Sequence, residues 1–317
     1  MRALQVSALD GPDAVVPAEV PEPAPGDGVV IDVHAAGVAF PDLLQTRGQY
    51  QRRPELPYVP GMEAAGTVRA APAGSGLRPG DRVAAFTRQG AFAEVAVAPA
   101  HLTFALPDAL DFAEGAALVL NTHTAAFALV TRGRLQAGET VLVHGAAGGV
   151  GTATLQVAHG LGARTIAVVS SDEKADVARR AGADDVVRSD GAWLDAVRGG
   201  VDLVVDPVGG DRFTDSLRSL RPGGRVLVVG FTAGSIPEVK VNRLLLTNTA
   251  VVGAAWGEWA SHRADSAREI GALVTRLVED GAVRPLVGER FPLERGADAL
   301  RLIERRGALG KIVLEVR

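Results

Sequence analysis

A glycine-rich turn between a short apolar run and a helical pattern constrains the fold of this chain more than any other feature. The apolar run Val141–Val143 ends at the glycine-rich segment 145–151, and a helical pattern with apolar residues spaced for packing follows. A second apolar run, Thr165–Val169, begins three residues after Gly162. Strand, glycine turn, helix and strand in this order are typical of a dinucleotide-binding unit; the alternative is an ordinary glycine-rich turn.

The glycines of this turn have the spacing that a bound pyrophosphate requires, although Ala146 stands where the usual fingerprint has its first glycine. Gly148 lets the backbone approach the pyrophosphate, and Gly151 lets the helix pack close to its strand. The first N–H groups of the helix then point at the phosphates. We therefore expect the cofactor to contact Ala147, Gly148, Gly149, Val150 and Gly151.

The end of the second strand indicates which dinucleotide binds. NAD sites usually place an Asp or Glu about 20 residues past the glycines, where it binds the ribose 2′-OH. Here the strand ends in Ser170 and Ser171, with Lys174 in the next turn, and two hydroxyls and a cation suit a 2′-phosphate. Asp172 and Glu173 bring negative charge nearby unless they face the solvent from the first turn of a helix. The pattern favours NADPH, with a solvated helix lysine as the alternative for Lys174.

Composition narrows the class of protein. A chain of 317 residues has room for two domains, and its net charge of −4 offers no general attraction for nucleic acid or anionic membranes. No apolar run reaches the roughly 18 residues of a transmembrane helix, and the N-terminus lacks the apolar core of a signal peptide. The lack of cysteine excludes disulfides, thiol catalysis and thiolate metal sites. We expect a cytoplasmic protein whose partner is a small molecule.

The chain divides into three parts by pattern. Residues 1–118 carry short strand-like runs separated by Pro and Gly turns, which predicts a compact, mostly β domain. Residues 119–260 alternate strand and helix, which predicts an α/β domain with a doubly wound parallel sheet covered on both faces. A helical pattern, Ser266–Val278, and a closing strand, Lys311–Val316, follow. The alternation of that last strand is typical of a sheet edge.

Several motifs in order along the chain resemble those of the medium-chain dehydrogenase/reductase superfamily. They are the segments Gly37–Val68, Ala146–Gly151, Ser170–Lys174, Gly182–Asp184 and Gly230–Gly257. Within that superfamily the chain resembles the zinc-free quinone oxidoreductase branch, related to zeta-crystallin. The resemblance implies a GroES-like catalytic domain of residues 1–118 completed by 261–317. It also implies a Rossmann domain of residues 119–260 that binds NADPH, and a cleft that holds the nicotinamide.

The zinc ligands of the zinc-dependent members are missing from the matching positions. Those enzymes carry a Cys about where Ala39 stands and a His at the position of Met62. Neither side chain is a plausible zinc ligand, and the six histidines show no metal-type spacing. We expect a metal-free enzyme. Quinone reductases often have Asn at position 39, so Ala39 also removes an amide that would contact substrate or nicotinamide.

Without a metal, hydride transfer needs an acceptor that is already electrophilic, such as a quinone or an α,β-unsaturated carbonyl compound. The product must then collect a proton from a side chain or from water. The resemblance places Tyr50 beside the nicotinamide, where it is either a proton donor or only a wall of the pocket. Asp42 matches a family aspartate in the same loop, which either orients the site or is a structural hydrogen-bond partner.

The resemblance assigns four further cofactor contacts, three of which have a structural alternative. Thr124 is expected near the nicotinamide, or is an ordinary threonine on a helix face. Phe231 is expected near the nicotinamide ribose, or is a core aromatic. Arg306 aligns with an arginine that reaches the 2′-phosphate, or is a surface charge. Ser189 replaces a tyrosine often found near the 2′-phosphate, where Arg188 beside it offers compensation.

Taken together, these features predict an NADPH-dependent, zinc-independent oxidoreductase that transfers a hydride to quinones or similar activated carbonyl compounds. One alternative is an enoyl-thioester or enone reductase that reduces a carbon–carbon double bond. Another is a low-turnover NADPH-binding sensor or structural protein. We also expect a homodimer, because the strand Ala250–Val252 and the apolar segment Ala254–Trp259 resemble an edge at which related sheets pair.

Overall fold

The computed structural model describes residues 1–317 and divides into two compact units. Unit 1 consists of Met1–Leu120, Ala260–Ala272 and Pro285–Arg317, and unit 2 consists of Asn121–Trp259 and Leu273–Arg284. No helix in the structure is both long enough and apolar enough to cross a bilayer.

The segment Leu273–Arg284 packs with unit 2, although the sequence places it with the domain formed by the chain ends. The packing has a clear cause. A Cβ built on Gly160 would meet Ala282 and Leu277 at 2.9 and 3.1 Å, so this part of the chain lies close against helix α4 (Gly149–Gly160). Gln156 of that helix also donates a hydrogen bond from Nε2 to the Arg284 carbonyl at 2.7 Å.

Unit 1 is built on a seven-stranded sheet in the order β14-β15-β3-β4-β5-β7, with β6 also paired to β3. All its pairings are antiparallel except the parallel pair β14 and β15. The strands are β3 (Gly28–Val38), β4 (Glu63–Ala70), β5 (Arg82–Phe86), β6 (Val95–Pro99), β7 (Thr103–Ala105), β14 (Val287–Pro292) and β15 (Lys311–Glu315). A separate hairpin pairs β1 (Arg2–Val6) with β2 (Val15–Glu19).

The expectation that the closing strand forms a sheet edge is wrong. β15 is paired on both sides, with β14 and with β3, and four of its five residues are buried. The edge strand is β14, whose residues are mostly exposed and which the sequence analysis missed. Its sequence, VGERFP, has too few apolar residues in alternation to stand out from a polar loop.

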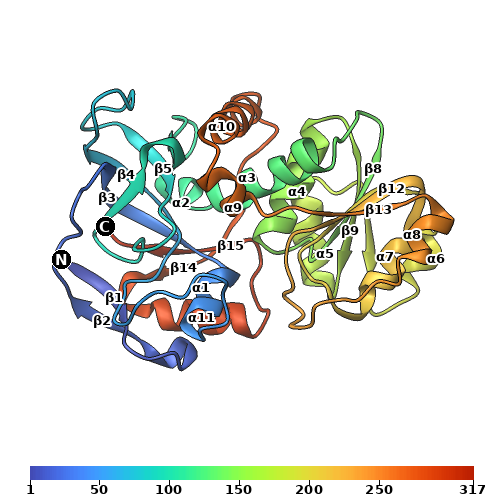
Figure 1. Ribbon diagram of the computed structural model, residues 1–317, viewed down its shortest axis with the longest axis horizontal. Helices are drawn as coiled ribbons and strands as arrows, with labels where there is room; N and C mark the ends of the chain where they lie inside the picture. The colour runs from blue at the N-terminus through green and yellow to red at the C-terminus, as the bar shows by residue number, and fades with distance from the viewer. The chain divides into compact units, whose positions relative to one another are not determined.

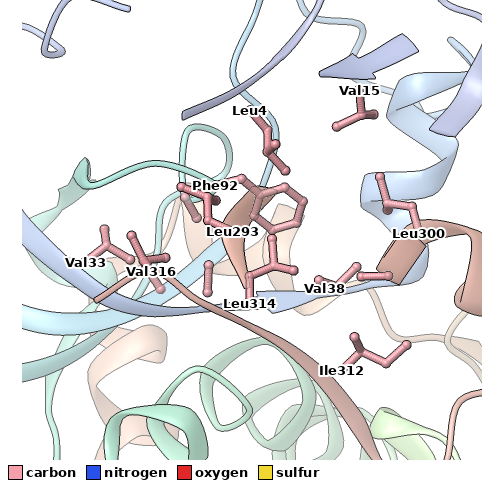
Figure 2. Close-up of a cluster of buried hydrophobic side chains, with 14 of the residues drawn as sticks. Leu4, Val15, Val33, Val38, Phe92, Leu293, Leu300, Ile312, Leu314 and Val316 are labelled. Atoms are coloured by element: carbon pink, nitrogen blue, oxygen red, sulfur yellow. The ribbon is translucent and has the colours of Figure 1, made fainter. Parts of the chain in front are cut away.

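The main core of unit 1 lies between this sheet and two helices, α1 (Phe40–Thr46) and α11 (Gly296–Glu304), whereas α2 (Phe112–Gly115) packs on β3 and β4 outside this core. Figure 2 shows its centre, where side chains from β1, β3, β15 and α11 meet around one aromatic ring. The buried residues labelled there are Leu4, Val15, Val33, Val38, Phe92, Leu293, Leu300, Ile312, Leu314 and Val316. Because β1, β3 and β15 come from both ends of the chain, this core cannot form without the C-terminal segment.

Unit 2 is built on a six-stranded sheet in the order β10-β9-β8-β11-β12-β13, and every pairing in it is parallel. The strands are β8 (Thr140–His144), β9 (Arg164–Val169), β10 (Asp185–Arg188), β11 (Val201–Asp206), β12 (Leu220–Val228) and β13 (Ala250–Gly253). The chain order reverses direction between β8 and β11, which is the place where doubly wound sheets bind ligands. The predicted α/β fold class is confirmed.

Helices cover both faces of this sheet, as Figure 1 shows. Helices α6 (Trp193–Val197) and α7 (Phe213–Ser219) share a core with the side chains of one face, whereas α4 and α5 (Asp172–Arg180) pack on the other. The remaining helices are α3 (Val119–Ala126), which a π-helical turn continues over Phe127–Arg132, α8 (Asn242–Thr247), α9 (Trp256–Ser261) and α10 (Ala264–Glu279).

Candidate active site

The carboxyl ends of the unit 2 strands bring five loops together along one margin of the sheet, which we call the carboxyl edge. Its residues are Ser189, 170–174, 145–149, 207–209 and 230–231. Backbone hydrogen bonds tie the loops after β10 and β8 to the end of β9. Ser189 N–H donates to the Val169 carbonyl at 2.8 Å, and Ala146 N–H donates to the Val168 carbonyl at 3.4 Å. Side-chain packing joins the others, because a Cβ on Gly145 would lie 3.1 Å from the Val208 side chain.

The glycine turn after β8 has the geometry that the sequence predicts. Gly145 has a φ of +58°, a left-handed conformation that favours glycine. A Cβ on Gly151 would lie 2.3 Å from the Gly145 carbonyl oxygen, so only glycine lets α4 pack this close to its strand. A Cβ on Gly148 would meet nothing nearer than 3.5 Å, so this backbone is open on the side where a pyrophosphate would approach.

The first turn of α4 leaves its backbone donors for a ligand. Gly148 is the N-cap of the helix, and no side chain caps it. The first N–H groups of a helix have no partner within the helix, and together with the helix dipole they attract phosphate. Gly149 faces the Asn121 side chain, since a Cβ there would lie 2.4 Å from Asn121 Nδ2. Asn121, which sequence reasoning missed, therefore holds α3 against this turn. Thr124 lies one turn further along α3 and is 8% exposed.

The side chains expected to bind a 2′-phosphate come together at the end of β9. Lys174 Nζ donates a hydrogen bond to Ser170 Oγ at 3.2 Å. Ser171 is the N-cap of α5 and accepts the Lys174 backbone N–H at 3.2 Å, which places the lysine over its own strand end. One ammonium and two hydroxyls therefore lie together where the ribose of a bound dinucleotide would reach.

Arg188, at the end of β10, is held beside this group by two carboxylates. Its Nη1 lies 2.5 Å from Asp172 Oδ1 and its Nη2 lies 2.8 Å from Asp190 Oδ2. Nη2 also donates to the Ser170 carbonyl at 3.1 Å. These carboxylates raise the pKa of the guanidinium. Asp172 is thus solvent-exposed, as expected for the first turn of a helix, but it is paired.

Beyond the glycine turn, the edge continues through the loops after β11 and β12. Asp206 is buried, and its Oδ1 accepts the backbone N–H groups of Val208 and Gly209 at 2.8 and 2.9 Å. Phe231 is half-buried and packs on this loop, because a Cβ on Gly209 would lie 3.0 Å from its ring.

His144, at the end of β8, is buried and makes a 2.8 Å hydrogen bond between its Nε2 and Ser216 Oγ. Burial lowers the pKa of His144 to about 4, so it is neutral near pH 7.

Unit 1 gathers Asp42, Glu63 and Lys311, which we call the buried charge cluster; all three are at most 3% exposed. Lys311 Nζ forms an ion pair with Glu63 Oε1. The other oxygen, Oε2, accepts the Leu120 backbone N–H at 2.8 Å, so the carboxylate also fixes the end of the chain segment at Leu120. Gly37 is required beside this pair, because a Cβ there would lie 2.6 Å from Glu63 Oε1.

Asp42 is the third member of the buried charge cluster and caps α1. Its Oδ2 accepts the Ala39 backbone N–H at 2.8 Å, whereas its Oδ1 has no hydrogen-bond partner. Burial raises the pKa of Asp42 to about 7, although Lys311 and the backbone hydrogen bond from Ala39 oppose the shift. These contacts are those of a structural hydrogen-bond partner. Whether Asp42 also acts on the reaction stays a prediction.

The two tyrosines of unit 1 have different environments. Tyr50 lies in a bend just after α1 and is half-buried. Tyr58 is 4% exposed, belongs to the core, and its hydroxyl has no hydrogen-bond partner. Burial and the nearby Asp42 carboxyl raise the pKa of Tyr58 to about 12. Of the two phenols, only Tyr50 is accessible to a ligand.

The predicted site residues fall into two groups. The cofactor residues Thr124, Ala147 to Gly151, Ser170, Ser171, Lys174, Ser189 and Phe231 all belong to unit 2. Tyr50, Asp42 and Arg306 belong to unit 1. Arg306 follows α11 in an exposed turn with a φ of +55°. The structure therefore brings the first group, apart from Thr124 on α3, together at the carboxyl edge and the start of α4. The roles of both groups stay predictions.

Comparisons with known proteins match both parts of this arrangement. Residues 25–108 match the family model of the alcohol dehydrogenase GroES-like domain, and residues 149–274 match that of the zinc-binding dehydrogenases. The quinone oxidoreductase of Rattus norvegicus is 35% identical, with 99% of this chain and 97% of the rat protein covered. The chain belongs to the medium-chain dehydrogenase/reductase superfamily, in its zinc-free quinone oxidoreductase branch.

Solved structures of this superfamily have the same fold. A probable oxidoreductase from Mycobacterium abscessus has a TM-score of 0.90 and 46% identity, over 100% of this chain and 99% of that one. A mycobacterial protein solved in complex with NADPH has a TM-score of 0.92 and 34% identity, over 100% of both chains. This membership makes the chain an oxidoreductase with a nicotinamide cofactor, and the carboxyl edge of unit 2 fits that cofactor.

Proposed function

We propose that this protein is an NADPH-dependent oxidoreductase that transfers a hydride to quinones or similar activated carbonyl compounds without zinc. The observation that carries the proposal is the carboxyl edge of unit 2. An open glycine turn, an uncapped helix N-terminus and the Lys174–Ser170 pair lie there in the order that pyrophosphate and 2′-phosphate require. The rat quinone oxidoreductase and the NADPH complex of a mycobacterial relative support the same assignment.

Zinc independence is supported by the residues at the ligand positions. Ala39 and Met62 supply no nitrogen, oxygen or thiolate ligand from their side chains, and the chain has no cysteine. No group of three or more histidine, aspartate or glutamate side chains lies close enough together to hold a metal ion. The nearby Glu63 carboxylate is taken by Lys311 and the Leu120 N–H. We expect the purified protein to keep its activity in a chelator; one zinc per chain, with activity lost on its removal, would contradict this.

The bound nicotinamide would supply the hydride, and the chain's own residues would bind, orient and protonate. Lys174 and Ser170 would hold the phosphate end, and the first N–H groups of α4 would hold the pyrophosphate. Tyr50 is the candidate donor of the proton that an enone or enoyl thioester must collect. Asp42 would act on Tyr50 only indirectly, because it fixes α1, which ends four residues before Tyr50.

Consumption of NADPH with a panel of quinones and a panel of enones and enoyl thioesters tests the proposal. Turnover with quinones supports it. Turnover confined to enones or enoyl thioesters would replace it by the double-bond reductase, for which the accessible Tyr50 is the favouring observation. Tight NADPH binding with no turnover in either panel would favour a sensor or structural protein instead.

We further propose that the protein is a homodimer joined through unit 2. β13 is an edge strand of the sheet, so one row of its backbone groups has no strand partner. Exposed apolar side chains lie on this strand and in the segment before it, which we call the apolar patch: Val251 of β13 at 37% exposure, and Ile236, Val241, Leu245 and Leu246 at 73, 76, 75 and 77%. A second copy related by a twofold axis would pair the two edges and cover both patches at once.

Sedimentation of the full chain at micromolar concentration tests the dimer. We expect twice the chain mass, and we expect Leu245→Glu with Leu246→Glu to give a folded monomer. Leu56→Glu is a matched control, since Leu56 is an exposed leucine of unit 1 outside the patch. A monomer mass for the unmodified chain would contradict the proposal.

A further inference from the structure

Arg188 lies at the point where a 2′-phosphate is expected, yet two carboxylates already occupy its guanidinium. It forms ion pairs with Asp172 at 2.5 Å and Asp190 at 2.8 Å and donates to the Ser170 carbonyl at 3.1 Å. The hydroxyl of the same serine contacts Lys174 Nζ at 3.2 Å. The two carboxylates that pair with Arg188 therefore balance the two cations, Arg188 and Lys174, at this strand end, where an NADPH-selective site would be expected to carry net positive charge.

We propose that Arg188 sets the cofactor preference indirectly, by neutralising Asp172 and Asp190, which otherwise repel the 2′-phosphate of NADPH. Asp172 and Asp190 are then specificity-determining residues that limit the preference for NADPH over NADH. The inference rests on the proposed binding of NADPH at the carboxyl edge and adds to it a group of three residues that act on the phosphate through their charge.

The contacts favour this role over direct binding of phosphate by Arg188. Both terminal nitrogens of the guanidinium already have carboxylate partners, and turning it toward a phosphate would leave two carboxylates unpaired beside the incoming anion. The partners are accessible to solvent, with Asp172 95% and Asp190 63% exposed, so their charges act through water and are screened by salt. A 2′-phosphate carries a charge of about −1.5 to −2 near pH 7, so it responds to each unbalanced carboxylate.

Calorimetric titration of the full chain with NADPH, NADH and adenosine 2′,5′-bisphosphate tests the inference. The last ligand carries the phosphate without the nicotinamide. Arg188→Ala should weaken the binding of NADPH and of the bisphosphate about three- to tenfold at low salt, because the charges involved lie near the surface and are partly screened. The binding of NADH should not weaken. Asp172→Asn with Asp190→Asn should strengthen NADPH by a similar factor. Arg179→Ala is the matched control, because it removes an exposed arginine on α5 whose carboxylate partner, Asp176, lies on the same helix.

The triple variant, Arg188→Ala with both aspartates changed to Asn, decides between an indirect and a direct role. If Arg188 acts by neutralising the carboxylates, NADPH affinity should return to within about threefold of the unmodified chain, since no unpaired charge remains. A triple variant as weak as Arg188→Ala would show direct contact with the phosphate and would overturn the inference. Equal losses of NADPH and NADH in Arg188→Ala would also overturn it.

These outcomes are separate from the fate of the proposed function. Failure of the unmodified chain to bind either nucleotide would remove the proposed function. Binding of both nucleotides with no change of preference in any variant would remove only the inference on Arg188. Since every readout is a dissociation constant, the result does not depend on which substrate the enzyme reduces.

Discussion

The carboxyl edge of unit 2 and the buried charge cluster of unit 1 both gather ionisable side chains at the ends of strands, but they use them differently. Along the carboxyl edge the charged side chains are exposed or half-exposed, and the glycine turn has open space beside its backbone. In unit 1, Asp42, Glu63 and Lys311 are buried, and Glu63 and Lys311 pair with each other. One region is arranged to receive a ligand, and the other holds the protein's own fold.

The difference shows that the location of a charged group decides its role more than its residue type does. An exposed ion pair contributes little to stability, so its loss costs the fold little. A buried pair is costly to break, because removal of one partner leaves an uncompensated charge. The buried charge cluster therefore predicts losses of stability, whereas the carboxyl edge predicts losses of binding, and variants in the two regions test that contrast.

The largest effect is expected when Lys311 is replaced. Lys311→Met leaves Glu63 unpaired in the interior beside Asp42, and breaking a buried pair in this way costs about 3–5 kcal/mol. Urea denaturation measures the change. Adding Glu63→Gln should restore part of the loss, and Arg179→Ala, an exposed arginine, should stay within about 0.5 kcal/mol of the unmodified chain. A loss below about 1 kcal/mol for Lys311→Met would mean that the pair does not hold the fold.

Two glycines of the same turn should respond differently to one added methyl group. Gly151→Ala places a Cβ 2.3 Å from a carbonyl oxygen, which should cost about 1–3 kcal/mol or more and abolish cofactor binding. Gly148→Ala meets nothing nearer than 3.5 Å, so it should keep the thermal stability and weaken NADPH binding. Thermal unfolding and NADPH titration of both variants measure the contrast. Equal stability losses would refute the idea that the Gly148 side is open to a ligand.

Replacement of the accessible tyrosine should affect chemistry and leave binding intact. If Tyr50 donates a proton, Tyr50→Phe should lower turnover of an enone or enoyl thioester at least about tenfold, with NADPH binding unchanged. Quinone reduction should be less sensitive, because a reduced quinone oxygen takes its proton from water. Tyr58→Phe is the control, since its buried hydroxyl has no partner. Unchanged turnover of both substrate classes in Tyr50→Phe would show that Tyr50 only lines the pocket and donates no proton.

The smallest effect is a pH dependence of stability that comes from Asp42. Its pKa is raised to about 7 in the folded protein, so folding is favoured while Asp42 is protonated. That contribution is lost as the pH rises from about 4 to about 7. Asp42→Asn cannot titrate, so the melting temperature of the variant should improve relative to the unmodified chain between pH 5 and pH 8. Asp108→Asn removes a fully exposed carboxyl and should show no such change. A difference in melting temperature between Asp42→Asn and the unmodified chain that does not vary with pH would contradict this prediction.

The carboxyl edge was largely predictable because its features are local in sequence. The turn from Gly145 to Gly151, the serine pair after β9 and the helix that Ser171 caps each span fewer than ten residues. Their chemistry follows from backbone conformation and from the order of parallel strands. The ion pair of Arg188 with Asp172 was not predictable, because the two residues are 16 apart in sequence and meet only through the pairing of β9 with β10, whereas Asp190 is a local neighbour of Arg188.

The buried charge cluster was not predictable from sequence, because its contacts join distant parts of the chain. Glu63 and Lys311 are 248 residues apart in sequence. The sequence pattern of Lys311 is that of a polar first residue in an exposed strand, and only the pairing of β14 with β15 shows that this strand lies inside the sheet. The burial of Tyr58 depends on its backbone pairing with Val6 of β1, which no local sequence pattern predicts. Asn121 likewise shows its role only when it is seen packed against Gly149.

Selection of NADPH by the carboxyl edge of unit 2 can be tested with one variant, Lys174→Ala. Dissociation constants for NADPH and NADH should be measured by calorimetry for this variant and the unmodified chain. A charge-assisted hydrogen bond to phosphate contributes roughly 1.5–3 kcal/mol, so NADPH should bind about ten- to hundredfold more weakly, with NADH nearly unchanged. Arg306→Ala should show the same selectivity with a smaller loss. Equal losses for both nucleotides in Lys174→Ala would show that this lysine supports the fold and does not bind the phosphate.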